Sequence, residues 1–205
     1  GIFIKEKCKE LVPDYLKFIK GLVDSDDFSL NISREMLQNS PMLRRINDNI
    51  EKKIIEKLKE IETNDYDKYL EFFKVFGDHI KYGIYVSYGM KKDLLSNLLV
   101  FHSLNNEKPI TLNTYKENMK EGQKYIYYAS GKTLDSIRML PQIEKFKEDG
   151  TDVILLDQHI DEFTIEMMKD YEKFEFRNIA SESKEQLSKE EQDNLDILLA
   201  ENKRI

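Results

Sequence analysis

Arg34 and Gln38 are the two side chains whose types and spacing could best do chemistry. They follow Ser33, whose hydroxyl can accept a hydrogen bond from a free amide at the start of a helix. Residues four positions apart project from the same helix face. A guanidinium fork and a carboxamide beside free backbone N–H groups predict a clamp for an anionic oxygen. The spacing alone favours two solvated polar residues, because such pairs occur on most helices.

Four long motifs accompany this pair along the chain. Phe18–Asp27 reads FIKGLVDSDD and Asn31–Gln38 reads NISREMLQ. Further on, Met119–Gly131 reads MKEGQKYIYYASG and Ile160–Phe163 reads IDEF. Together they resemble the middle domain of the ninety-kilodalton heat-shock protein family, in its bacterial, HtpG-type branch, and the resemblance extends to about Ala180.

This resemblance implies a chaperone ATPase role for the pair. Members of the family are homodimeric, ATP-driven chaperones with a nucleotide-binding N-terminal domain, a middle domain and a C-terminal dimerisation domain. ATP and Mg²⁺ would be bound by the N-terminal domain, while Arg34 and Gln38 would reach the γ-phosphate and Asn31, Ile32 and Ser33 would hold the loop. A positioned arginine stabilises the charge that builds on the oxygens during phosphoryl transfer. Hydrolysis would then depend on closure between domains.

Without the nucleotide domain, the chain by itself is expected neither to bind ATP well nor to hydrolyse it. No cofactor or metal is expected within it. Its start at Gly1, without an initiating methionine, suggests a segment of a longer protein.

The resemblance also implies a surface for unfolded or partly folded client proteins on a helix expected over Ile160–Tyr171. Its acidic, aromatic and methionine side chains would be adaptable contacts. Many family members carry tryptophan where this chain has Phe163. Alternatively, Phe163 and Met167 pack on the sheet. The client-binding candidates are Glu162, Phe163, Glu166 and Met167, with Met168 beside them.

Two other functions remain open from the sequence. The chain could be a non-catalytic module that binds clients or co-chaperones. It could also be an α/β segment whose function lies wholly in other parts of the protein.

Composition excludes several classes of protein. The net charge of −7 argues against nonspecific binding to nucleic acid, which needs a basic face. Cys8 is the single cysteine, so no disulfide framework or thiolate metal site is expected. The three histidines are scattered, without metal-binding spacing. No apolar run has membrane-spanning length and no signal peptide is evident, which together favour a cytoplasmic location.

The first hundred residues predict a strand and helices. Ile2–Lys5 reads as a strand and Leu11–Ile19 as a short helix. A long amphipathic helix should start at Ser40-Pro41, where serine is a good N-cap and proline suits the first helical position. An aromatic helix should follow over Tyr66–Phe76 and stop at Gly77, with another over Asp93–Val100. The charged side chains of the long helix, among them Arg44, Arg45, Asp48, Glu51, Lys52 and Glu56, read as a solvated face.

The second half alternates between strands and helices. Tyr125–Ala129, Val153–Leu156 and Phe174–Ile179 read as strands, and the uniformly apolar second strand suits a parallel sheet covered on both faces. Helices should be capped by Thr133, restarted at Pro141 and closed at Gly150. This order implies right-handed crossovers.

The predicted fold class is α/β. Residues 1–62 should form the end of a larger αβα subdomain, with the catalytic loop at 30–38 and the long helix. Residues 63–102 should form a helical connector, and 103–180 a small αβα layer subdomain with a mainly parallel sheet. Residues 181–205 should lead towards the C-terminal domain.

Overall fold

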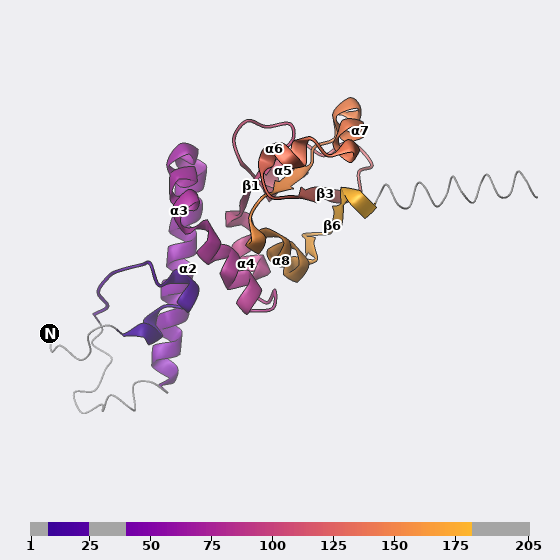
Figure 1. Cartoon of the computed structure of the whole chain (residues 1–205). Coiled ribbons are helices and arrows are strands. Elements are labelled where there is room, and N and C mark those ends of the chain that lie inside the picture. The colour runs from indigo at the N-terminus through magenta and orange to yellow at the C-terminus, as the bar shows by residue number, and fades with distance from the viewer. Residues whose placement is uncertain (1–7, 25–39, 182–205) are drawn as a thin grey trace, which may run out of the picture. The chain divides into compact units, whose positions relative to one another are not determined.

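The computed structural model describes residues 8–24 and 40–181, which divide into two units between Leu99 and Val100 (Figure 1). The predicted strand Ile2–Lys5, the loop at 30–38 and residues 182–205 of the expected linker lie outside the described residues. Among the helices that are described, none combines the length and apolar character needed to cross a membrane.

The long helix of the first unit, α2, spans Pro41–Asn64 and confirms the predicted start. The Ser40 hydroxyl accepts a hydrogen bond from the Met42 amide at 3.3 Å, and Pro41 occupies the first turn, where its missing N–H costs nothing. Asp65 ends α2 and also caps the next helix by accepting from the Lys68 amide.

Helix α3 runs from Tyr66 to Val86, so the prediction that Gly77 ends it is wrong. Gly77 and Gly83 are both buried inside this helix. A Cβ atom at Gly77 would lie 2.5 Å from the Phe73 ring. The glycine therefore makes room for an aromatic ring one turn earlier, rather than breaking the helix.

Two 3₁₀ turns replace the helix predicted over Leu11–Ile19. They are η1, Lys9–Leu11, and η2, Asp14–Leu16. Val12 between them is extended, with φ −136° and ψ 144°. The residue before a proline is pushed out of the helical region, so Pro13 accounts for the interruption.

The helix predicted over Asp93–Val100 is also shorter than expected. Helix α4 covers Lys92–Leu95, and a 3₁₀ turn, η3, continues it through Ser96–Leu98. Val100 already belongs to the first strand of the second unit.

The second unit contains a six-stranded sheet in the order β2-β1-β4-β3-β6-β5. Its three central strands are parallel and confirm the three predicted strands; they are β3 (Tyr125–Ser130), β4 (Ile154–Leu156) and β6 (Phe174–Asn178). Three short antiparallel strands flank them and were not predicted: β1 (Val100–Ser103), β2 (Ile110–Thr111) and β5 (Asp170–Tyr171). The predicted α/β class is confirmed.

Helices lie on both faces of this sheet (Figure 1). The connection from β3 to β4 carries α6 and α7, and the connection from β4 towards β6 carries α8. The two connections run in opposite directions across the sheet, so right-handed crossovers place their helices on opposite faces. The helices of this unit are α5 (Leu112–Glu117), α6 (Leu134–Arg138), α7 (Pro141–Asp149) and α8 (His159–Met168).

The ends of these helices follow predicted signals. Thr133 and Ser136 form a reciprocal capping box at the start of α6. Pro141 begins α7, and Gly150 ends it with a left-handed φ of 70°.

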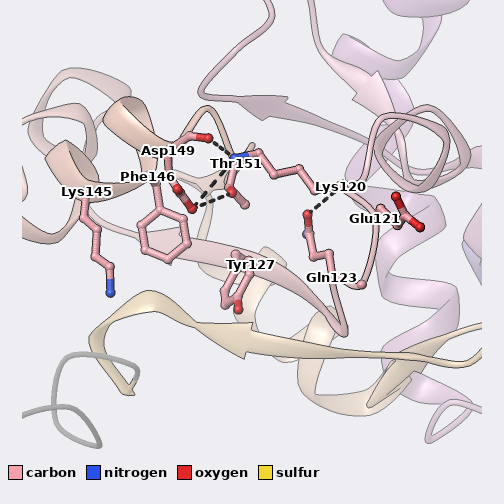
Figure 2. A pocket seen from close by; sticks show the side chains of 9 residues that line it. Lys120, Glu121, Gln123, Tyr127, Lys145, Phe146, Asp149 and Thr151 are labelled. Atoms are coloured by element: carbon pink, nitrogen blue, oxygen red, sulfur yellow. Dashed lines mark hydrogen bonds and ion pairs between the residues drawn. The ribbon is translucent and has the colours of Figure 1, made fainter.

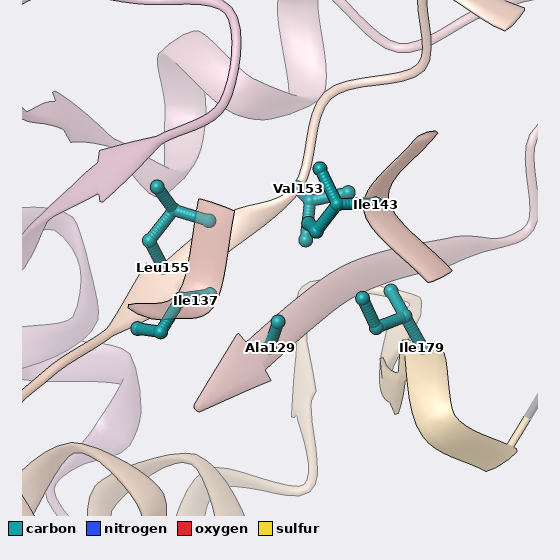
Figure 3. Packing of buried hydrophobic residues seen from close by; sticks show 6 residues of the cluster. All are labelled: Ala129, Ile137, Ile143, Val153, Leu155 and Ile179. Atoms are coloured by element: carbon teal, nitrogen blue, oxygen red, sulfur yellow. The ribbon is translucent and has the colours of Figure 1, made fainter. Parts of the chain in front are cut away.

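One face of the sheet supplies an apolar core under α6 and α7 (Figure 3). Alternation along a strand sends every second side chain to the same face, which is why β4 contributes Leu155 together with the preceding Val153. The fully enclosed members of this cluster are Ala129, Ile137, Ile143, Val153, Leu155 and Ile179.

Candidate functional site

The residues predicted to serve ATP hydrolysis, Arg34 and Gln38, lie outside the described residues. The same holds for the three loop-supporting residues Asn31, Ile32 and Ser33. The structure does describe both flanks of this stretch: residues 8–24 before it, and α2 directly after it.

Residues 8–24 are attached to α2 by two hydrogen bonds. The Asn47 side-chain amide donates to the Glu10 carbonyl at 2.7 Å. The Tyr15 hydroxyl donates to Glu51 Oε1 at 2.5 Å. Tyr15 and Leu16 are both buried, so the short turn η2 is packed rather than solvated.

An aromatic contact fastens the same segment to α3. The Phe18 ring stacks on Phe76, with centroids 4.5 Å apart and an interplanar angle of 21°. Phe18 also meets the rings of Phe72 and His79 at 5.8 and 5.6 Å. The part of this segment from Glu10 to Phe18 is therefore held against both long helices, although it contains only two short 3₁₀ turns.

Glu51 is the main correction to the expected solvated face of α2. It is 7% exposed and bonds with Tyr15 and with the Lys91 ammonium group. The Lys91 nitrogen also lies 5.6 Å from the centroid of the Tyr15 ring. Burial raises the pKa of the Tyr15 hydroxyl well above its usual value, and the hydrogen bond to Glu51 and its charge add to this.

No spacing signal could have identified this cluster. Glu51 is separated by 36 residues from Tyr15 and by 40 from Lys91. The three side chains meet only because residues 8–24 and the turn after α3 both pack on α2.

The predicted client-binding side chains lie on α8, which ends at Met168 instead of continuing to Tyr171. Lys169 follows with a φ of 63°, and β5 begins at Asp170. A left-handed residue cannot extend a right-handed helix, so the helix stops there.

Exposure along α8 follows the helical repeat. Glu162 and Glu166 are exposed, Phe163 is 51% exposed and Met167 is half-buried. Phe163 is therefore not enclosed in the core of the sheet, and about half of its surface faces solvent. Met168 was expected on the surface but is buried, together with Thr164 and Ile165.

The acidic face of α8 adjoins the carboxyl end of β3. The Ser130 hydroxyl donates to Glu162 Oε1 at 2.5 Å. Burial raises the pKa of the Tyr128 hydroxyl, and the charge of Glu162 acts in the same direction. Exposed carboxylates beside an exposed phenyl ring form a surface suited to cationic and apolar groups.

A cavity of about 280 Å³ lies elsewhere in the second unit, between the start of β3 and α7 (Figure 2). The rings of Tyr127 and Phe146 meet edge to face at 5.0 Å. Lys120 at its wall is paired with Asp149, with 3.8 Å between ammonium nitrogen and carboxylate oxygen. Charged groups of both signs line the cavity, namely Lys120, Lys145, Glu121 and Asp149.

Metal chemistry has no candidate among the residues described. Within 8–24 and 40–181, no group of three or more His, Cys, Asp or Glu side chains could hold a metal ion.

The fold is that of an Hsp90 middle domain. The structure matches the solved middle domain of a heat shock protein from Plasmodium falciparum with a TM-score of 0.74 and 32% sequence identity. The match covers 87% of this chain and 69% of that one.

The sequence shows the family. The profile of the Hsp90 protein family matches residues 1–203, so the chain belongs to this family. It is 44% identical to the chaperone protein HtpG of Clostridium perfringens and 42% identical to that of Oceanobacillus iheyensis, over 98% of its length in each case. It spans only about a third of these curated relatives, 33% of each.

Proposed function

We propose that the chain is the C-terminal part of the middle domain of a cytoplasmic, homodimeric chaperone that is driven by ATP. In this proposal, ATP and Mg²⁺ are bound by an N-terminal domain of the full-length protein. Arg34 and Gln38 contact the γ-phosphate, and the C-terminal domain joins the two protomers. The isolated chain is inactive because it supplies only part of the site.

The observation that carries the proposal is the continuous family match through residues 1–203, which includes Asn31–Gln38. A second observation supports it. The flanks of this stretch are fastened to one rigid helix, since Tyr15 is bonded to α2 and α2 itself begins at Pro41. An arginine that stabilises a transition state must be held by its surroundings, because positioning is most of what catalyses phosphoryl transfer.

The test is ATP turnover by the full-length protein and its Arg34→Ala variant. Loss of a transition-state donor should lower kcat by roughly a hundredfold or more. The KM for ATP should change little if the N-terminal domain supplies most of the binding energy. The matched control is Arg44→Ala, which removes an exposed arginine from the first turn of α2. Near-parental hydrolysis by Arg34→Ala would reject the catalytic role.

A second proposed function is client binding by α8, favoured by the exposure of Glu162, Phe163 and Glu166. Its partner would be a partly unfolded segment with basic and apolar side chains. Carboxylates attract the basic groups and the phenyl ring contacts the apolar ones. In this reading the chain acts as a binding module for clients or co-chaperones with no share in catalysis.

Charge reversal on α8 tests this function in a binding titration with a partly unfolded protein. The Glu162→Lys, Glu166→Lys double variant should bind more weakly than the parent, and the difference should shrink as salt is added. A Glu148→Lys, Glu175→Lys variant makes the same change in net charge at exposed positions of the same unit. Equal weakening by both double variants would show a general charge effect and would remove α8 as the site.

A further inference from the structure

Helix α3 carries two apolar faces. One packs into the first unit and includes the enclosed side chains of Tyr69, Phe73 and Ile80. The other is exposed or half-buried, and its residues recur along the helix at alternating spacings of three and four. We call this second face the α3 seam, and it consists of Phe72, Val75, His79, Tyr82 and Val86.

The middle of the seam is open to solvent. Val75 is 66% exposed and Tyr82 45%. Phe72 and His79 are half-buried, and their rings meet that of Phe18 at centroid distances of 5.8 and 5.6 Å. Single exposed apolar residues are ordinary on a protein surface. A regular row of them, on a side of the helix away from the core, calls for a partner.

The spacing of the seam fits a second helix. Alternating steps of three and four residues average about 3.5, the repeat that keeps one face of a helix against another helix. Phe72, His79 and Val86 take one of the two seam positions of the heptad, and Val75 and Tyr82 take the other. An extended strand would not follow this row, because its side chains share a face at every second residue.

The charges beside the seam select the kind of helix. Glu71 and Asp78 each precede a seam residue by one position and are exposed. They are seven residues apart, so they lie along the same border of the seam. Asp78 is also 3.7 Å from the ammonium group of the buried Lys81, which leaves Glu71 as the stronger charge. Flanking positions of paired helices favour opposite charges, so this border favours a basic partner.

A second copy of this chain fits the seam less well. Phe76 and Gly83 occupy the opposite border. In a parallel pair of α3 helices, Glu71 of one copy would face this apolar border of the other. In an antiparallel pair, the carboxylates of the two copies would face each other and repel.

We propose that the α3 seam is a docking surface for an amphipathic helix of a partner protein, with an apolar stripe at heptad spacing and lysine or arginine beside it. The apolar stripe covers Val75 and Tyr82, and the basic side chains pair with Glu71 and Asp78. This docking depends neither on the proposed ATP hydrolysis nor on client binding by α8.

The probe is a fluorescent peptide of about three heptads, with leucine at the seam positions and lysine at the flanking positions. Its twin has glutamate in place of lysine. Fluorescence anisotropy should show that the lysine peptide binds this chain and the full-length protein alike, roughly tenfold or more tightly than the glutamate peptide, with a smaller advantage at high ionic strength. Equal affinities for the two peptides, or no binding, would overturn the proposal. Binding to this chain but not to the full-length protein would show that another part of the same protein covers the seam, and would also overturn it.

A double variant tests the apolar part of the seam. Val75→Gln with Tyr82→Gln removes exposed apolar surface and should weaken binding of the lysine peptide roughly tenfold or more. The matched control is Tyr88→Gln with Met90→Gln, which removes two more exposed apolar side chains just beyond α3 and should bind as the parent does. Equal weakening by the two double variants would overturn the seam as the site. A parent chain that sediments as a dimer, and a seam variant that sediments as a monomer, would identify a second copy as the occupant instead.

Charge reversal provides the second test. Glu71→Lys should weaken binding of the lysine peptide and strengthen that of the glutamate peptide, whereas Glu56→Lys, at an exposed position of α2, should do neither. The Glu162→Lys, Glu166→Lys variant of α8 should keep most of the affinity. Loss of binding in the α8 variant, with parental binding in Glu71→Lys, would place the peptide on α8 and overturn the proposal.

Discussion

The cost of burying Glu51 depends on both of its partners. An enclosed carboxylate loses its hydration, and the bonds from Tyr15 and Lys91 offset that loss. Because Lys91 remains partly exposed, the Lys91–Glu51 ion pair is intermediate between a surface pair, which contributes little to stability, and a fully buried pair. Its main contribution is to select one arrangement of three segments.

Glu51→Ala should lower the free energy of unfolding by about 2–3 kcal/mol, because it leaves a buried hydroxyl and a half-buried ammonium group without their acceptor. Glu56→Ala removes an exposed glutamate from the same helix and should change stability by less than about 0.5 kcal/mol. Chemical denaturation of the two variants beside the parent makes the comparison. Equal midpoints for the two variants would contradict the importance of the buried carboxylate.

Two tyrosines with raised pKa values make stability depend on alkaline pH. Burial, and then the charge of Glu62, raises the pKa of Tyr66 from 10.0 to about 12. Burial, followed by the charge of Glu172, raises that of Tyr171 from 10.0 to about 12. The folded chain therefore holds these phenolic protons more tightly than the unfolded chain does. The contribution to stability is fully present below pH 10 and is lost as the pH rises through about 12.

Phenolate absorbance measured together with circular dichroism should show this dependence. Tyr66 and Tyr171 should form phenolates only as the pH approaches about 12 or as the fold is lost. Formation of all the phenolates near pH 10 with unchanged circular dichroism would contradict the raised pKa values of Tyr66 and Tyr171.

At the scale of elements, Gly83 lets α3 pack closely against its neighbours, and it does not act as a flexible point in the helix. A Cβ atom at Gly83 would lie 2.7 Å from the Tyr15 ring and 3.0 Å from Leu95. Those neighbours are themselves buried and have little room to move. The close approach of η2 to α3 is therefore possible only because this position has no side chain.

Gly83→Ala should be destabilising by about 1–2 kcal/mol. Overpacking a filled site costs about 1–3 kcal/mol, which outweighs the gain of up to about 1 kcal/mol from placing alanine in a helix. Gly21→Ala is the control, since nothing lies within 4 Å of its added methyl group. Thermal unfolding of both variants tests the prediction, and a stabilised Gly83→Ala would show that helix propensity wins.

Local signals in the sequence predicted the elements whose causes are local. Ser40-Pro41 predicted the start of α2, Gly150 the end of α7, and apolar runs the three parallel strands. Each depends on residues close together in the chain. The prediction at Gly77 was wrong because this glycine makes room for the Phe73 ring inside a helix that continues past it.

The remaining errors come from tertiary partners. Glu51 looked solvated because its partners are remote in the sequence, and strands of two residues such as β2 and β5 have no periodicity to detect. For the candidate site, exposure of Glu162 and Phe163 agrees with the surface expected for α8, whereas the roles of Arg34 and Gln38 stay predictions.

At the scale of the whole molecule, the second unit has stabilising interactions that lie entirely within it. The second unit has a six-stranded sheet and an apolar cluster drawn entirely from its own residues (Figure 3). Its hydrogen bonds include the Arg138 guanidinium, which donates to the carbonyl groups of Ser103 and Leu104 at 3.0 and 3.2 Å. These interactions do not require the first unit.

A protein made of residues 100–181 alone should therefore fold. It should give a dispersed amide spectrum and a single cooperative thermal transition, as small domains do. Ile165→Ala within it should cost about 2–5 kcal/mol because the side chain is enclosed, whereas Phe163→Ala should cost far less because half of the ring is already solvated. A collapsed amide spectrum for the parent would show that the unit needs the rest of the chain.

The outermost strands of the sheet, β2 and β5, have two residues each. So short a border offers few main-chain groups to a foreign strand, which makes it a poor template for amyloid-like growth. A chaperone of the proposed kind would bind partly unfolded polypeptides whose strands have unpaired edges. Because its edge strands are so short, the sheet can lie next to such chains without forming intermolecular strand pairs with them.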